Sequence, residues 1–122
     1  MNTKVKTTFL KKYEGYKNEG LSEPEIAEVM NLDNTLVLRR ARHLCVETDE
    51  HAAKRRDICE KALDWGRDGA LSDEELARRL GVSKYKMYEY VNTTLQEKPT
   101  INAIKNALIF DLDETEMEEE EN

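Results

Sequence analysis

The sequence predicts an all-α protein made of two small units, each built around a pair of short helices. Only five of its 122 residues are Gly and two are Pro, and 37% of the side chains are charged. This composition favours helices and lacks the turn residues that a β-sandwich or barrel needs. A repeat at a spacing of fifty residues, with a helix-start signal in each copy, predicts the two units.

The repeat aligns residues 17–34 with residues 67–84 without a gap. Each copy contains Ser-x-x-Glu, at Ser22 and at Ser72, which is the pattern of a capping box and predicts that a helix begins there. Apolar residues then recur at the spacing of one helix face. The matched apolar residues are Ile26, Ala27, Met30 and Leu32 in the first copy, and Leu76, Ala77, Leu80 and Val82 in the second.

A short turn and a second helix follow in each copy. Asn31 and Gly81 stand where the first helix should end, and these residue types accept the left-handed backbone conformation most readily. We expect Asp33 and Ser83 to cap the second helices. In the first copy that helix spans residues 34–45, with Val37, Ala41 and Leu44 facing inward.

Three further helices are predicted outside the repeat. Residues 5–18 carry an apolar stripe that runs from Val5 to Tyr16, and residues 51–68 carry another. The second stripe comprises Ile58, Cys59, Ala62, Leu63 and Trp65 or Gly66. The last helix should begin near Pro99-Thr100. We therefore expect about seven helices, with a first unit at residues 1–48, a second with the C-terminal helix at 49–110, and a tail at 111–122.

The charge of the chain is concentrated in that tail. The formal net charge is −7, which by itself argues against a nucleic-acid binder. Eight acids and no base lie in residues 111–122, so the remaining 18 acids nearly balance the 19 Lys and Arg and leave residues 1–110 at +1. We expect a disordered acidic tail that either solubilises the protein, covers its basic helices or binds a basic protein partner.

The cysteines and the hydropathy pattern indicate a cytoplasmic protein without a membrane segment. Cys45 and Cys59 are too few for a disulfide framework, and the N-terminus has no long apolar run. The spacing of His43, Cys45, His51 and Cys59 matches no zinc pattern, so we expect buried cysteines and neither a metal nor another cofactor. No phosphate loop or nucleophile signature is present, which speaks against an enzyme.

The second copy resembles a known family. LSDEELARRLGVSKYKMYEYV (71–91), with Ala77, Gly81, Val82 and Met87 at the motif positions, resembles the helix-turn-helix of phage-repressor-type (Cro/repressor, XRE-like) DNA-binding domains. The resemblance continues through residues 97–114, where a Pro opens a helix that ends in an Ala-Leu pair. It implies that the second helix of each pair enters the major groove of DNA.

Candidate DNA-binding residues follow from that resemblance and from the basic helix of the first copy. Polar residues near a helix N-terminus would meet base edges, and Arg residues three apart on one face suit phosphates or guanine. The candidates in the first copy are Asn34, Thr35, Arg39, Arg40, Arg42 and His43. Those in the second copy are Ser83, Lys84, Tyr85, Lys86 and Tyr88.

Two functions remain open at this level. The first is a sequence-specific transcriptional regulator of phage or mobile-element type that binds double-stranded DNA, either as a monomer or as a homodimer through residues 100–110. The second is a protein-binding adaptor or inhibitor, built on the same scaffolds, that targets a host DNA- or RNA-processing complex. Asp73, Glu74, Glu75 and the acidic tail favour the second function, whereas the Arg cluster favours the first.

Overall fold

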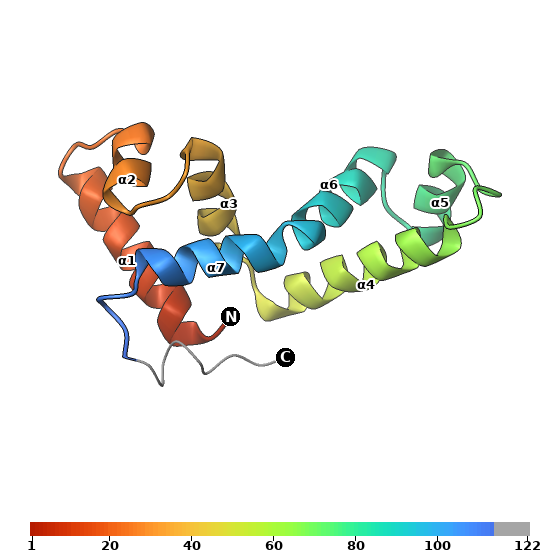
Figure 1. The fold of residues 1–122 in the computed structure, drawn as a ribbon. Coiled ribbons are helices and arrows are strands. Elements are labelled where there is room, and N and C mark those ends of the chain that lie inside the picture. Colours follow the sequence, from red (N-terminus) through yellow and green to blue (C-terminus); the bar gives the residue numbers. More distant parts are fainter. Residues whose placement is uncertain (114–122) are drawn as a thin grey trace. The chain divides into compact units, whose positions relative to one another are not determined.

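The computed structural model describes residues 1–113, and all regular structure in this part of the chain is α-helical, as predicted (Figure 1). The helices are α1 (Thr3–Asn18), α2 (Glu23–Val29), α3 (Thr35–Val46), α4 (Asp49–Trp65), α5 (Asp73–Leu80), α6 (Lys84–Leu95) and α7 (Glu97–Ala107). None of them is long and apolar enough to cross a membrane. The last helix begins two residues before Pro99, because a Pro in the first helical turn removes only an N–H that has no partner within the helix.

The helices form two compact units. Unit 1 comprises residues 1–46 and the segment that begins at Lys98, and unit 2 comprises Glu47–Glu97. The repeat in the sequence instead predicts that the C-terminal helix belongs to the second unit. The structure groups it with unit 1 because Ile104 and Leu108 are fully buried in the core of that unit. Leu112, inside the predicted tail, is also buried there, whereas residues 114–122 of that tail lie outside the described residues.

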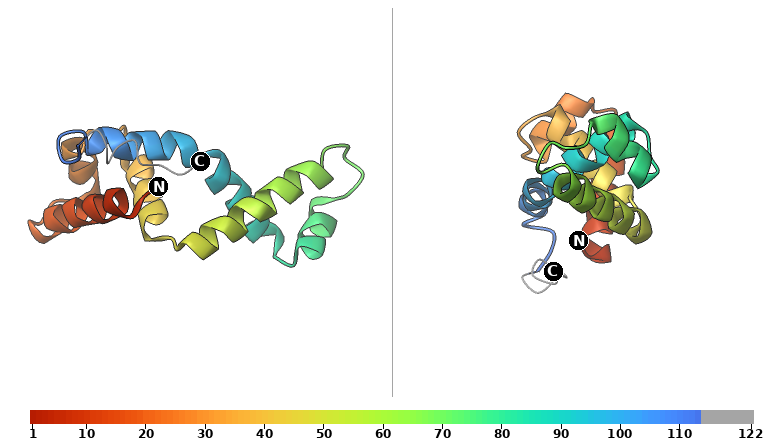
Figure 2. Two further views of the ribbon diagram at one scale, coloured as in Figure 1. Left: turned by 90° about the horizontal axis from the view of Figure 1, so that it is seen from below. Right: turned by 90° about the vertical axis from the view of Figure 1, so that its right-hand side faces the viewer.

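The core of unit 1 is formed by α1, α2, α3 and the end of α7 (Figure 2). The stripe predicted on α1 is confirmed, since Val5, Phe9 and Tyr13 are buried. On α3, the predicted inward residues Ala41 and Leu44 are buried, whereas Val37 is only partly buried and Leu38 is fully buried in its place. The other buried members are Ile26, Ala27, Met30, Leu32 and Cys45.

Unit 2 consists of α4, α5 and α6, with α4 packed along α6 and both in contact with α5. Its apolar cluster comprises Ala62, Leu76, Ala77 and Met87. The predicted inward positions of Leu63 and Trp65 are wrong, since both side chains are exposed. The buried stripe of α4 continues at helical spacing from Ala62 to Gly66, where a Cβ atom would lie 3.1 Å from a methyl carbon of Leu76.

The turn between α2 and α3 has the predicted signals, with one correction. The capping box at Ser22 is complete, and Asn31 adopts the left-handed conformation with a φ of 60°. The cap of α3, however, is Asn34 and not Asp33: the Asn34 Oδ1 accepts from the Val37 backbone N–H at 3.0 Å. The helix starts at Thr35, directly after this cap, and Leu38 lies on its buried side.

The turn between α5 and α6 forms as predicted, whereas the predicted capping box at the start of α5 forms only in part. Gly81 ends α5 with a φ of 76°, and the Ser83 hydroxyl accepts from the Lys86 backbone N–H at 3.0 Å. The Ser72 hydroxyl accepts from the Glu75 backbone N–H at 3.1 Å. The Glu75 carboxylate bonds to the guanidinium groups of Arg78 and Arg79 instead of returning to Ser72.

A buried arginine joins the beginning and the end of unit 2. The Arg55 side chain, on α4, is only 1% exposed. Its Nε and Nη2 donate to the two carboxylate oxygens of Glu47 at 2.9 and 2.8 Å. Its Nη1 donates to the Thr94 hydroxyl at 2.8 Å and to Glu97 Oε1 at 3.1 Å. Arg55 therefore holds the first and the last residue of unit 2.

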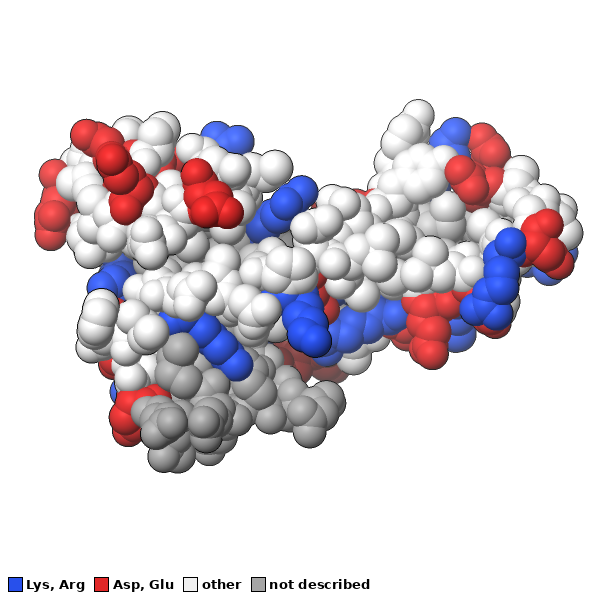
Figure 3. All heavy atoms as spheres, in the orientation of Figure 1, with Lys and Arg blue, Asp and Glu red and all other residues white. Residues whose placement is uncertain are grey.

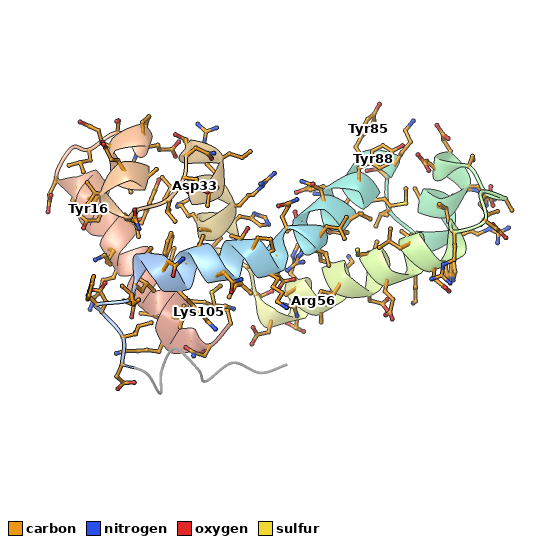
Figure 4. All side chains as sticks on the ribbon, viewed as in Figure 1. Tyr16, Asp33, Arg56, Tyr85, Tyr88 and Lys105 are labelled. Atoms are coloured by element: carbon orange, nitrogen blue, oxygen red, sulfur yellow. The ribbon has the colours of Figure 1, made fainter. Side chains whose placement is uncertain are left out.

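Further hydrogen bonds complete this network. The imidazole Nδ1 of His51 lies 2.6 Å from Glu47 Oε2, and the Tyr90 hydroxyl lies 3.3 Å from His51 Nε2. Arg56, labelled in Figure 4, binds the Glu97 carboxylate from the solvent side. Burial acts to raise the pKa of Glu47, but the hydrogen bonds from Arg55 and His51 prevail and hold it at about 2.

We predict that the two glycines Gly15 and Gly81 respond oppositely to alanine. Neither added Cβ would meet an atom within 4 Å, so backbone conformation decides the outcome. Gly81→Ala should destabilise the protein by about 1 kcal/mol because its φ is positive, whereas Gly15→Ala, within α1, should stabilise it by about 0.5–1 kcal/mol. Thermal unfolding followed by circular dichroism checks both, and a stabilising Gly81→Ala would contradict the assigned turn.

We predict that Arg55→Met destabilises unit 2 far more than Arg56→Met does. Removing Arg55 leaves Glu47 buried without its main partner, at a cost of about 3–5 kcal/mol. Arg56 is half exposed, so its loss should cost less than about 1 kcal/mol. Urea unfolding at neutral pH measures both free energies. Equal losses for the two variants would show that the buried network does not hold unit 2 together.

We predict that unit 2 loses stability in acid because of Glu47. Its pKa falls from the ordinary 4.5 to about 2 on folding, so its contribution is complete above about pH 4.5 and disappears as the pH falls through about 2. The lowered pKa of Glu97 acts in the same direction. The free energy of unfolding of Glu47→Gln, measured from pH 7 to 2.5, should start lower and decline less steeply than that of the wild type. Parallel curves for the two proteins would contradict this assignment.

Candidate nucleic-acid interface

The exposed face of α3 carries most of the candidate residues of unit 1. Leu38, Ala41, Leu44 and Cys45 face the interior, which turns the opposite side of the helix outward. Arg39 and Arg42 are exposed and, three residues apart, lie within about 60° of each other around the helix axis. The helix contains three Arg and one His and no acidic residue. It therefore presents a locally basic surface although the chain as a whole is acidic.

Two neighbours position these arginines. The Arg39 Nε donates to Glu23 Oε1, on α2, at 3.0 Å, while 67% of the Arg39 side chain stays exposed. The guanidinium carbon of Arg42 lies 5.1 Å from the ring centroid of Tyr13, on α1, in cation–π geometry. Neither partner is predictable from sequence patterns, because each lies on another helix. The packing of α1 and α2 against α3 brings Tyr13 and Glu23 to these arginines.

The remaining candidates of unit 1 lie along α3, from its cap to its last turn. The Asn34 carbonyl oxygen is used for the cap, which leaves its amide N–H groups as donors. Thr35 is half-buried in the first turn. Arg40 is half-buried, and His43 is exposed in the last turn. Thr35, Arg39, Arg42 and His43 share the outward side of the helix, whereas Arg40 lies toward its flank.

The lysines predicted to bind DNA in unit 2 both have acidic partners. The Lys84 Nζ lies 2.8 Å from Glu74 Oε2, and the Lys86 Nζ lies 3.1 Å from Glu89 Oε1. The hydrogen bond to Glu74 is the main cause that raises the pKa of Lys84, and Glu89 does the same for Lys86. On the face shown in Figure 3, basic and acidic atoms of α4–α6 lie next to one another. Ser83 is occupied with the cap of α6.

Tyrosines dominate the outward side of α6 near its N-terminus. Tyr85 is 75% exposed and packs edge-to-face against Tyr88, with ring centroids 6.4 Å apart (Figure 4). The Tyr88 hydroxyl donates to the Asp73 carboxylate, and this hydrogen bond is the main cause that raises the pKa of Tyr88. Tyr90, further along the same helix, is buried. This surface is aromatic with paired charges at its edge.

The cysteines and histidines do not assemble a metal site. No group of three or more His, Cys, Asp or Glu within residues 1–113 is arranged to hold a metal ion. Cys45 lies in the core of unit 1, where burial raises the pKa of its thiol to about 12. Burial also raises the pKa of Cys59. Both thiols are therefore protonated and unreactive at neutral pH.

Comparisons with known proteins contribute no relative. No protein-family model matches the chain, and neither a curated protein nor a solved structure matches it significantly.

Proposed function

We propose that the protein binds double-stranded DNA through α3 of unit 1 and acts as a transcriptional regulator. The observation that carries this proposal is the exposed arginine face of α3, a helix without acidic residues that is capped at its start and packed against α1 and α2. A basic helix of this length fits the major groove, and Arg residues bind both phosphates and guanine.

The geometry of Arg42 suits this role. Stacking of the guanidinium over the Tyr13 ring restricts the side chain, which lowers the entropy that binding must remove. The N–H groups of a stacked guanidinium point along its plane and remain able to donate to an anion. Arg42 is thus oriented before DNA arrives.

The Glu23 carboxylate competes with DNA phosphates for the guanidinium of Arg39. The Glu23 carboxylate holds one guanidinium nitrogen of Arg39, so a phosphate must share or replace this acid. An exposed pair of this kind contributes about 0.2–1 kcal/mol. Glu23 therefore weakens non-specific binding to DNA phosphates. As a result, contacts with the bases supply a larger share of the total affinity.

Unit 2 favours a second candidate function, a protein-binding adaptor or inhibitor that acts on a host DNA- or RNA-processing complex. The observation behind it is the exposed pair Tyr85 and Tyr88 beside lysines that already have acidic partners. Tyrosine is enriched at the centres of protein interfaces, with polar residues at the rim. A homodimer through residues 100–110 would have to use other side chains of this segment, since Ile104 and Leu108 are buried in unit 1.

We predict that Arg39→Glu with Arg42→Glu abolishes retardation of the protein's own promoter fragment without unfolding the protein. The milder pair Arg39→Gln with Arg42→Gln should lower the slope of log affinity against log salt concentration by about two, because two phosphate contacts are lost. Glu23→Gln should raise affinity about two- to fivefold, because it removes the competitor of Arg39.

A charge-matched control separates local contact from net charge. Arg67→Glu with Arg78→Glu changes the net charge by the same amount at two exposed side chains of unit 2 and should leave retardation nearly intact. Undiminished binding by the α3 variant, or equal loss in both double variants, would falsify the role of α3. Lys84→Glu with Lys86→Glu then tests whether α6 also contacts DNA, as the resemblance of residues 71–91 implies.

A further inference from the structure

A short turn at the end of α7 presents two large apolar side chains to solvent. Phe110 is 97% exposed and Ile109 is 54% exposed. Their neighbours in the chain behave oppositely, since Leu108 and Leu112 are buried in the core of unit 1. We call residues 108–112 the Phe110 turn.

The Phe110 turn is held in place from both sides. The backbone N–H groups of Asp111 and Leu112 donate to the Leu108 carbonyl at 2.8 and 3.2 Å. The Asp111 carboxylate binds the Lys12 ammonium, on α1, at 3.1 Å. With Leu108 and Leu112 occupying the core, Phe110 has no place inside the unit. Its phenyl ring is therefore presented to solvent on a hydrogen-bonded turn, and an exposed aromatic ring of this kind can serve as an interface anchor.

The charges around the Phe110 turn indicate what covers it. Asp111 and Asp113 flank the phenyl group, and six further acids follow in the sequence up to Glu121. A two-fold contact between copies would bring these acids together, and like charges would repel. DNA phosphates are disfavoured for the same reason.

We propose that Phe110, with Ile109, inserts into an apolar pocket of another protein whose rim carries Lys and Arg. The phenyl and isoleucine side chains supply the buried contact, Asp111 and Asp113 lie beside it toward the basic rim, and the net negative charge of this end of the chain accelerates association. This surface belongs to unit 1 but does not use α3, so the proposal stands independently of DNA binding.

Site-specific photo-crosslinking of the full-length chain tests the proposal. The chain with Phe110→p-benzoylphenylalanine is irradiated in a lysate of cells that express the protein naturally, and cross-linked sites are mapped by mass spectrometry. We expect one predominant partner, cross-linked within an apolar pocket bordered by Lys or Arg. Excess wild-type chain should compete, whereas Phe110→Ser should compete at least about tenfold less well.

Two further competitors serve as controls. Leu63→Ser replaces a half-exposed apolar residue of unit 2, and this variant should compete like the wild type. Neutralising Glu118–Glu121 to Gln should weaken competition at 50 mM salt and much less at 500 mM salt, because salt screens the rim contacts. Phe110→Ser should unfold at the wild-type temperature, since the replaced ring is solvated.

Other results would overturn the proposal. They are crosslinks to a second copy of the chain, crosslinks to a pocket with an acidic rim, equal competition by Phe110→Ser and wild type, or no specific crosslink. Sedimentation equilibrium of the purified protein provides an independent check, in which a dimer that Phe110→Ser dissolves would show that a second copy covers this surface.

Discussion

The buried Arg55 guanidinium is the interaction on which unit 2 depends. It bonds to Glu47 and Glu97, the residues at which the chain enters and leaves this unit. The apolar cluster around Ala62 lies toward the other end of α4. Ion pairs and hydrogen bonds therefore stabilise one end of the unit, and apolar packing stabilises the other. Buried charges cost several kcal/mol unless all partners are present, and here each polar partner comes from the unit itself.

Internal pairing of charges also distinguishes the surfaces of the two units. In unit 2, Lys84, Lys86 and Arg78 each bind an acid from α5 or α6. In unit 1, α3 has no acid of its own, and only Glu23 from α2 reaches Arg39. A chain with a net charge of −7 therefore presents a locally basic surface on α3, and the distribution of acidic partners matters more than their number.

Local rules predicted much of the fold and of the candidate interface. Ser22, Ser72 and Ser83 cap helices where their spacing indicated, and Asn31 and Gly81 take positive φ values because few other residues tolerate them. The choice of Asn34 over Asp33 was beyond such rules. Both residue types cap helices well, and the structure shows that the Asn34 side chain accepts the Val37 backbone N–H.

Local rules did not predict which side chains from other helices would contact Arg55, Arg42 and Tyr88. Arg55 stands in the sequence inside a basic stretch, where an exposed position is the natural expectation. Its burial depends on Glu97, which is 42 residues away. The stacking of Arg42 on Tyr13 and the pairing of Tyr88 with Asp73 likewise join separate helices.

By itself, the sequence determined the helical content, the caps at Ser22, Ser72 and Ser83, the main apolar stripes and the basic character of α3, because these depend on residues within a few positions of each other. Only the tertiary structure decided that the end of α7 completes unit 1, that Arg55 is buried, and that Phe110 is held in solvent. Each of these depends on which distant groups meet, and helical periodicity carries no information about that.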